Sequence, residues 1–283
     1  MKVRPAVFSR MGWYPESKEE CERMIKEWSK NKVKIGSERV KGIGGIVPHA
    51  GWFFSGEIAC TVFRCLSEIS KPDTVIIFGK HLTAGSKRSI MKEGLWETPF
   101  GNIEIDSEFA SRITEKAEFI IETATSFEED NTIELQLPFV KYFFPQSKLI
   151  PIGAPPTKES LELARKIAHI SKELKRSVLV IGSTDLTHYG PNYGFMPAGT
   201  GINALRWSKE NDFRIIEKMK ELDAEGIIEE ALRNQNACCP GACASAVAMA
   251  KELGAERGEM LMYATSYEKS PSSSFVGYVG VVF

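Results

Sequence analysis

Neither an excess of charge of one sign nor a long apolar run occurs in this sequence of 283 residues. Its 36 basic and 37 acidic residues are well mixed and leave a formal net charge of −1. Proteins that bind nucleic acid or anionic membranes concentrate basic residues, so we expect neither as a partner. No run approaches the length of a transmembrane helix, and the apolar run within residues 1–10 is too short for a secretory signal. These absences predict a soluble, cytoplasmic protein.

Internal repeats, low-complexity tracts and Pro/Gly/Ser-rich linkers are also absent. Helix and strand patterns alternate along nearly the whole chain, and its length suffices for one large α/β domain. We therefore predict a single α/β domain over residues 1–283. Six cysteines in a cytoplasmic chain of this length are more typical of buried thiols or metal ligands than of a disulfide framework. Cys60 and Cys65, in an apolar segment, are expected in the core.

The positions of the elements follow from apolar periodicity and from turn residues. One strand is predicted to end at His49, and others to cover 74–79, 119–122, 148–152, 177–182, 260–267 and 275–283. A hairpin-rich excursion is predicted over 89–105. Helices are predicted over 17–30, from the glycines after His49 to about 70, and over 107–116, 132–143, 158–175, 204–221, 224–233 and 241–253.

Three of the four histidines, His49, His81 and His188, each come just after a predicted strand. Ligands of open α/β sheets gather beyond the carboxyl ends of the strands, so these imidazoles are predicted to share one site. Each alone is equally compatible with a loop histidine that bonds a carbonyl or caps a helix. Asp185 and neighbouring hydroxyls favour proton transfer at His188. His169 falls inside a predicted helix and is expected to be a surface or packing residue.

Cys238, Cys239 and Cys243 cluster at a predicted helix N-terminus, where the helix dipole favours the metal-binding thiolate. Adjacent cysteines do not readily face one small site, so at most one of Cys238 and Cys239 is expected to be a ligand. For Cys239 and Cys243, a buried thiol is a strong alternative to a ligand. Glu134 lies in an apolar helical turn, where burial would raise its pKa and suit acid/base chemistry. A Glu on a solvated helix face would look the same.

Together these motifs resemble the Memo family, also called protein B of the AmmeMemoRadiSam system. Its members share a fold with the class III (LigB-like) extradiol ring-cleavage dioxygenases. The resemblance spans almost the whole chain. The matching segments are Arg4-Pro-Ala-Val7 with Trp13-Tyr-Pro15, Pro48–Gly56, Gly79–His81, Trp96–Gly101 with Ile105-Asp106, Glu134–Pro138, Ser183–Gly190 and the late cysteine-glycine turn.

The resemblance implies a single three-layer α/β/α domain of LigB-like type with a mostly parallel or mixed central sheet. It also implies a metal pocket formed by His49, His81 and Cys238, with His188 as a proton-transfer group. Fe(II) is the expected metal, with Zn or Cu as alternatives. Ring cleavage does not follow from the fold alone, because the dioxygenases use a carboxylate as third ligand.

Three positions depart from the family pattern: Asn131 stands where a histidine is common, Cys239 where a glycine is usual, and Phe54 where tyrosine is frequent. Asn131 cannot act as a base, and Cys239 offers a second thiol.

Three functions remain open on this basis. The first is an iron-dependent redox enzyme acting on a small molecule, with His188 as base and Asp185 orienting it. The second is a non-catalytic metal-binding or protein-interaction module with a protein partner. The third is a zinc-dependent hydrolase. The substrate and the oligomeric state are not predicted.

Overall fold

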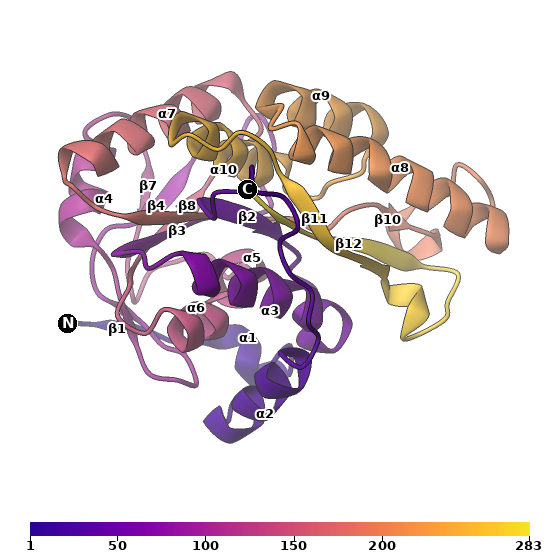
Figure 1. The fold of residues 1–283 in the computed structure, drawn as a ribbon, viewed down its shortest axis with the longest axis horizontal. Helices are drawn as coiled ribbons and strands as arrows, with labels where there is room; N and C mark the ends of the chain where they lie inside the picture. Colours follow the sequence, from indigo (N-terminus) through magenta and orange to yellow (C-terminus); the bar gives the residue numbers. More distant parts are fainter.

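Four buried, mostly aliphatic runs form the parallel centre of one large sheet. They pair in the order β2 (Gly44–Val47), β9 (Val178–Ser183), β3 (Thr74–Gly79) and β8 (Lys148–Gly153). Nearly every residue in them is buried, as in strands covered on both faces. The computed structural model describes residues 1–283 and places this sheet at the centre of the molecule (Figure 1).

The flanks of the sheet are partly antiparallel. Beyond β8, β4 (Ser89–Met91) is antiparallel to its neighbour and pairs with β7 (Ile120–Glu122). Beyond β2, β12 (Phe275–Val282) is antiparallel and also pairs with β11 (Glu259–Thr265) and β10 (His188–Tyr189). The nine-stranded sheet is therefore mixed and mostly parallel at its centre, as predicted.

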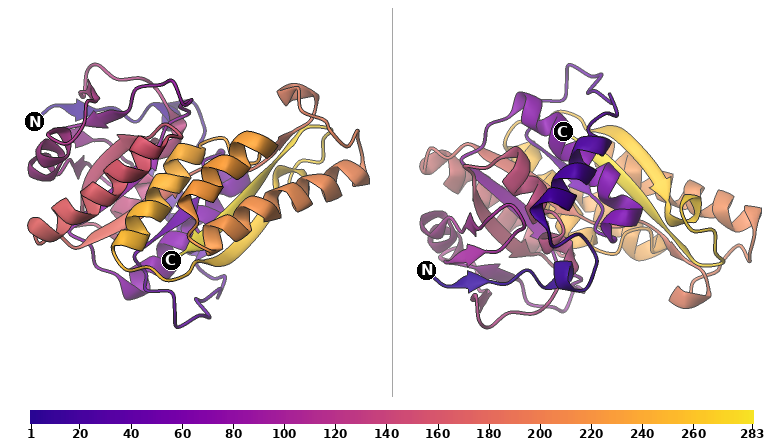
Figure 2. Two further views of the ribbon diagram at one scale, coloured as in Figure 1. Left: turned by 90° about the horizontal axis from the view of Figure 1, so that it is seen from above. Right: turned by 90° about the horizontal axis from the view of Figure 1, so that it is seen from below.

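Helices cover both faces of the sheet, which gives the predicted three layers (Figures 1 and 2). One layer consists of α7 (Lys158–Glu173), α8 (Ile202–Lys220), α9 (Ala224–Asn234) and α10 (Pro240–Glu252), with α4 (Ser107–Thr114) packed on α7. The opposite layer consists of α3 (Trp52–Ile69), α1 (Val7–Arg10), α2 (Lys18–Trp28), α5 (Asn131–Glu134) and α6 (Leu137–Phe143). No helix is both long and apolar enough to cross a bilayer.

The structure corrects two local predictions. The single helix predicted over 132–143 is divided into α5 and α6, because Pro138 has no N–H to bond the carbonyl four residues earlier. The excursion over 89–105 supplies β4 to the main sheet, whereas β5 (Leu95–Trp96) and β6 (Ile103–Glu104) form an antiparallel pair. β1 (Val3–Arg4) adds to β5 in parallel and completes a small second sheet that was not predicted.

The main apolar core is a cluster of 66 buried residues that draws on elements from α2 to β12, and two clusters of three buried residues each lie apart from it. Cys60 and Cys65 are buried in α3, as expected. Because the strands are held by this core, the loops that follow them leave from fixed positions.

Candidate metal centre and its pocket

The carboxyl ends of β2, β3 and β9 bring the predicted site residues together. His49, His81 and Asp185 each lie two residues beyond their strand, and Cys238 and Cys239 come just before α10. One ligand atom each from His49, His81, Cys238 and Cys239 lies within 4.8 Å of the others. The imidazole ring centroids of the two histidines are 5.0 Å apart. The predicted convergence of His49, His81 and Cys238 is therefore present.

His49 is buried, and its hydrogen bonds determine which ring nitrogen faces the cluster. The hydroxyl of Ser183 donates to the carbonyl of Thr132 at 2.8 Å, so its oxygen accepts from Nδ1 of His49 at 3.0 Å. When the ring is neutral, Nε2 carries no proton, and it lies 3.2 Å from Sγ of Cys238. Burial would lower the pKa of His49, but the charges of Asp185 and Cys238 raise it, so the ring is readily protonated while no metal is bound. A histidine whose Nδ1–H is held in this way presents Nε2 as a metal ligand.

His81 is presented by a strained turn and held by a carboxylate. The preceding residue, Lys80, has a φ of 71°, a left-handed conformation uncommon for a side chain of this size. Asp130 accepts from the His81 backbone N–H at 3.2 Å and from Nδ1 at 3.0 Å. Burial alone would lower the pKa of His81, but the hydrogen bonds to Asp130 and Cys238 outweigh it and raise it to about 10. Nε2 of His81 thus also faces the cluster.

Cys238 has the environment of a thiolate. Its sulfur accepts the backbone N–H of Asp185 at 3.3 Å as well as facing His49. Burial would raise the pKa of Cys238, but hydrogen bonds from Cys239 and the two histidines, together with the charge of His49, hold it well below its usual range. Burial and the neighbouring Cys238 raise the pKa of Cys239. The metal-ligand form of sulfur is therefore favoured at Cys238.

The expectation that adjacent cysteines would not share one site is wrong, since both sulfurs belong to the cluster, 3.7 Å apart. The backbone explains this arrangement. The Cys238 N–H donates to the Asp185 carbonyl and the Cys239 N–H to Oγ1 of Thr184, both at 3.1 Å. The chain is thereby folded against the loop after β9 as it enters α10. Cys243, one turn into α10, is buried as expected.

Asp185 has a different partner from the one predicted. Its Oδ1 accepts the backbone N–H of His49 at 2.7 Å, and no hydrogen bond joins it to His188. Burial raises the pKa of Asp185, and the charge of His49 opposes that shift. Nδ1 of His188 instead lies 3.0 Å from the carbonyl of Leu186, and its ring stands edge-on to Tyr193 with centroids 4.9 Å apart. Asp185 thus holds the His49 loop rather than the His188 ring.

Glu134 is buried but does not line the pocket. Its carboxylate accepts the backbone N–H of Phe8 at 2.6 Å and the hydroxyl of Tyr14 at 3.2 Å. Burial raises its pKa, as the sequence led us to expect. At the other end of α5, Asn131 does reach the pocket and donates to the carbonyl of His49 at 2.8 Å. Glu134 therefore anchors the N-terminal segment, and Asn131 fixes the His49 loop.

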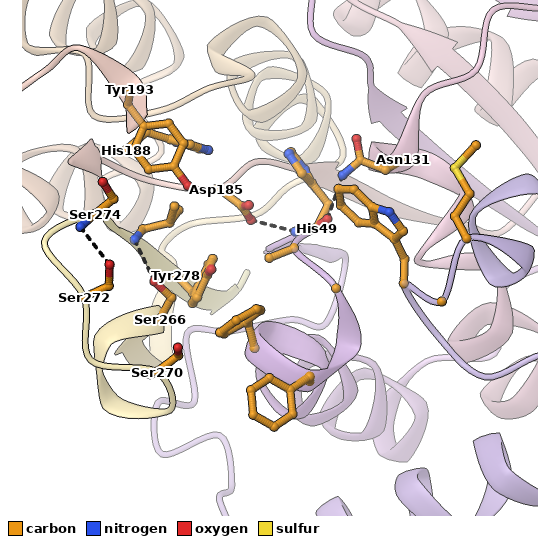
Figure 3. Close-up of a pocket in the computed structure, with 18 of the residues that line it drawn as sticks. His49, Asn131, Asp185, His188, Tyr193, Ser266, Ser270, Ser272, Ser274 and Tyr278 are labelled. Atoms are coloured by element: carbon orange, nitrogen blue, oxygen red, sulfur yellow. Dashed lines mark hydrogen bonds between the residues drawn. The ribbon is translucent and has the colours of Figure 1, made fainter. Parts of the chain in front are cut away.

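A cavity of about 660 Å³ opens beside the cluster (Figure 3). His49, His81, Asn131, Asp185 and His188 line its inner part. Aromatic and hydroxyl side chains supply much of the remaining lining, among them Phe53, Phe54, Tyr193, Tyr278, Ser266, Ser270, Ser272 and Ser274. No Lys or Arg lines it. The cavity offers aromatic faces and hydrogen-bonding groups to a small molecule.

A second cavity, of about 490 Å³, reaches the same cluster from another side. It shares His81, His188 and Tyr193 with the first, and it is also lined by Cys238. Most of its lining residues are apolar. The cluster can therefore be approached by way of two differently lined cavities.

Sequence reasoning missed three residues of this site: Ser183, Asp130 and Tyr278. The Ser183 hydroxyl was included among the hydroxyls around Asp185, but these were associated with His188, the nearest histidine in sequence. Asp130 caps the short helix α5, and an acid directly before that helix was the available signal. Nothing in the sequence around Tyr278 marks it as a pocket residue.

The fold and the site define an α/β protein with a His/Cys cluster that could hold a metal ion at its strand ends. Residues 10–282 match the Memo-like protein family. The chain is 35% identical over 270 residues to a MEMO1 family protein of Thermococcus onnurineus, covering 92% of each. It is 35% identical over 290 residues to one of Pyrococcus furiosus, covering 99% of this chain and 98% of that one. The chain belongs to the Memo-like family, as the motifs indicated.

A solved structure shares the fold. It is described as an uncharacterized protein, JW3007, from Escherichia coli K12, and it aligns with a TM-score of 0.53 over 84% of this chain and 98% of that one. The two sequences are 9% identical, so this likeness concerns the fold alone.

Proposed function

We propose that the chain binds Fe(II) through His49, His81 and Cys238 and carries out oxygen-dependent redox chemistry on a small aromatic or heteroaromatic molecule. The observation that supports this most is that one ring nitrogen each from His49 and His81 and the sulfur of Cys238 lie within 4.8 Å of one another. Hydrogen bonds at Nδ1 of both histidines orient the imidazole rings, and these bonds do not depend on a bound metal.

The donor set fits this metal. Imidazole nitrogen suits Fe, Zn and Cu, and thiolate suits the softer members of that group. Three protein ligands leave coordination positions open, and the large cavity lies beside them. When bound, Fe(II) supplies an electron-transfer centre with positions free for substrate and oxygen.

The remaining residues bind the substrate and move a proton. Nδ1–H of His188 donates to Leu186, so Nε2 is the free acceptor, and His188 lines the cavity. It serves as the base. Tyr278 and Phe54 offer faces for a planar ring, and the serine hydroxyls hydrogen-bond to its substituents.

Metal content tests this proposal. Protein purified without oxygen is analysed by elemental mass spectrometry as wild type, His49→Ala and Cys238→Ser. His169→Ala is the matched control, because that imidazole is exposed on α7 and pairs only with Glu252. We expect near-stoichiometric iron in the wild type and the control, and its loss from both site variants. Full metal in both site variants would overturn the assignment.

The second cysteine supports a zinc site as an alternative. Two His and two Cys are a common structural zinc set, and with only three ligands a zinc-bound water would favour hydrolysis. Zinc in the wild type that is lost from Cys239→Ser would indicate four protein ligands and no open position. Zinc retained in that variant would favour the hydrolase. A wild type without any metal would favour a protein-interaction module.

A further inference from the structure

Cys238 and Cys239 present two sulfurs side by side at the cluster, although neighbouring side chains usually diverge. We propose that this pair is a redox-modification site: when no metal holds Cys238, a hydroperoxide oxidises the two thiols to a disulfide between adjacent residues, which removes the sulfur ligand from the site. The disulfide itself is independent of the proposed function, and only its effect on metal binding rests on that function.

The backbone holds the two sulfurs in place for this reaction. They are 3.7 Å apart, and bonding requires about 2.05 Å. The Cys238 amide is tied to the carbonyl of Asp185 and the Cys239 amide to the hydroxyl of Thr184. Closing the remaining distance requires rotation of the two side chains and distortion of the peptide between them, while the loop after β9 keeps both residues in place.

Access favours oxidation of Cys238 first. This residue is half-buried and lines the 490 Å³ cavity, whereas Cys239 is 1% exposed. The other cysteines, Cys21, Cys60, Cys65 and Cys243, are buried and lie outside the cluster. An oxidant in the cavity thus meets Cys238, and the thiol beside it is Cys239.

The reaction balances with a hydroperoxide as the two-electron oxidant. The sulfur of Cys238 attacks the terminal peroxide oxygen, the O–O bond breaks, and a sulfenic acid forms as water or an alcohol leaves. The sulfur of Cys239 then displaces hydroxide from the sulfenic acid, and its own proton leaves with that hydroxide as water. Two thiols are oxidised to one disulfide, and one hydroperoxide is reduced.

The product is expected to be easily reduced. Adjacent Cα atoms are about 3.8 Å apart, which is shorter than the range of about 4.4–6.8 Å usual for disulfides. Strain of this kind makes a disulfide labile, as regulatory disulfides are. A dithiol should therefore restore the metal-binding form.

The test uses metal-free full-length protein treated with equimolar hydrogen peroxide, then alkylated and analysed by intact and peptide mass spectrometry. We expect the wild type to lose two hydrogens, with neither Cys238 nor Cys239 alkylated, and dithiothreitol to reverse the change. Cys239→Ala should instead gain oxygen at Cys238, and Cys65→Ala should behave as wild type. Oxygen addition alone in the wild type, or a bond mapped to another pair, would overturn the proposal.

A replacement variant and a metal-loaded sample separate the disulfide from its effect on metal binding. Cys239→Ser replaces Cys239→Ala if circular dichroism shows that the alanine variant is unfolded. Metal-loaded wild type should oxidise at least about tenfold more slowly, because the bound sulfur is no longer a free nucleophile. Absence of this protection, with the disulfide still formed, would count against the metal site alone. Absence of the disulfide in protein that binds metal would count against the switch alone.

Discussion

Asp212 provides the sharpest prediction of pH-dependent stability. This carboxylate on α8 is fully buried and forms no ion pair. It accepts the backbone N–H of Thr187 at 2.9 Å and the hydroxyl of Tyr263 at 2.8 Å. Burial raises the pKa of Asp212 from 3.8 to about 7, and these hydrogen bonds oppose the shift only in part. The residue it holds, Thr187, adjoins His188.

The sign and size of the effect follow from linkage. The folded chain binds this proton more tightly than the unfolded chain, so stability falls as the pH rises from 3.8 to about 7 and then levels off. Each pH unit in that interval contributes about 1.4 kcal/mol. The loss is therefore about 4 kcal/mol in all, and about 3 kcal/mol of it falls above pH 5.

Asp212→Asn removes this dependence while keeping an oxygen that accepts from Thr187. The free energy of unfolding is measured by urea denaturation for both proteins, and the value for wild type is subtracted from that for the variant. We expect this difference to increase by about 3 kcal/mol between pH 5 and pH 9. Asp223→Asn is the control, because the Lys218 ammonium lowers the pKa of Asp223 and its titration lies at more acidic pH. Parallel pH profiles for wild type and Asp212→Asn would refute the reasoning.

Three further substitutions test the contacts around the cluster. Ser183→Ala removes the acceptor of His49 Nδ1–H and should weaken metal binding by about 10–100-fold in chelator competition; unchanged affinity would contradict this. Asp130→Asn should lower the pKa of His81 from about 10 toward 6.5 in an NMR titration of metal-free protein, and an unmoved value would show that Asp130 is not its partner. Glu134→Gln should destabilise the fold by about 1–2 kcal/mol through Phe8 and Tyr14 without loss of metal, whereas lost metal would place Glu134 in the site.

The sequence was sufficient for the elements that carry short, continuous apolar runs. β2, β3 and β9 are such runs, so the convergence of His49 and His81 could be predicted from the general behaviour of parallel strands. The strands β1, β5 and β6 have two residues each and carry no periodic signal, which is why the second sheet was missed.

Partners of the site residues depend on register, which the sequence did not reveal. Val47 pairs with Ser183 across β2 and β9, so the residues two positions later, His49 and Asp185, lie opposite each other. Sequence proximity had instead linked Asp185 to His188. The contact between His81 and Asp130 likewise joins residues 49 positions apart and depends on how α5 packs on β3.

Cobalt(II) binding tests the central claim most directly, because a cobalt–thiolate bond gives charge-transfer absorption in the near ultraviolet. Metal-free protein titrated with Co(II) without oxygen should show this band as wild type and as Cys239→Ser. The band should disappear in Cys238→Ser and weaken strongly in His49→Ala. A wild type without the band, or a band unchanged in Cys238→Ser, would contradict the metal centre described above.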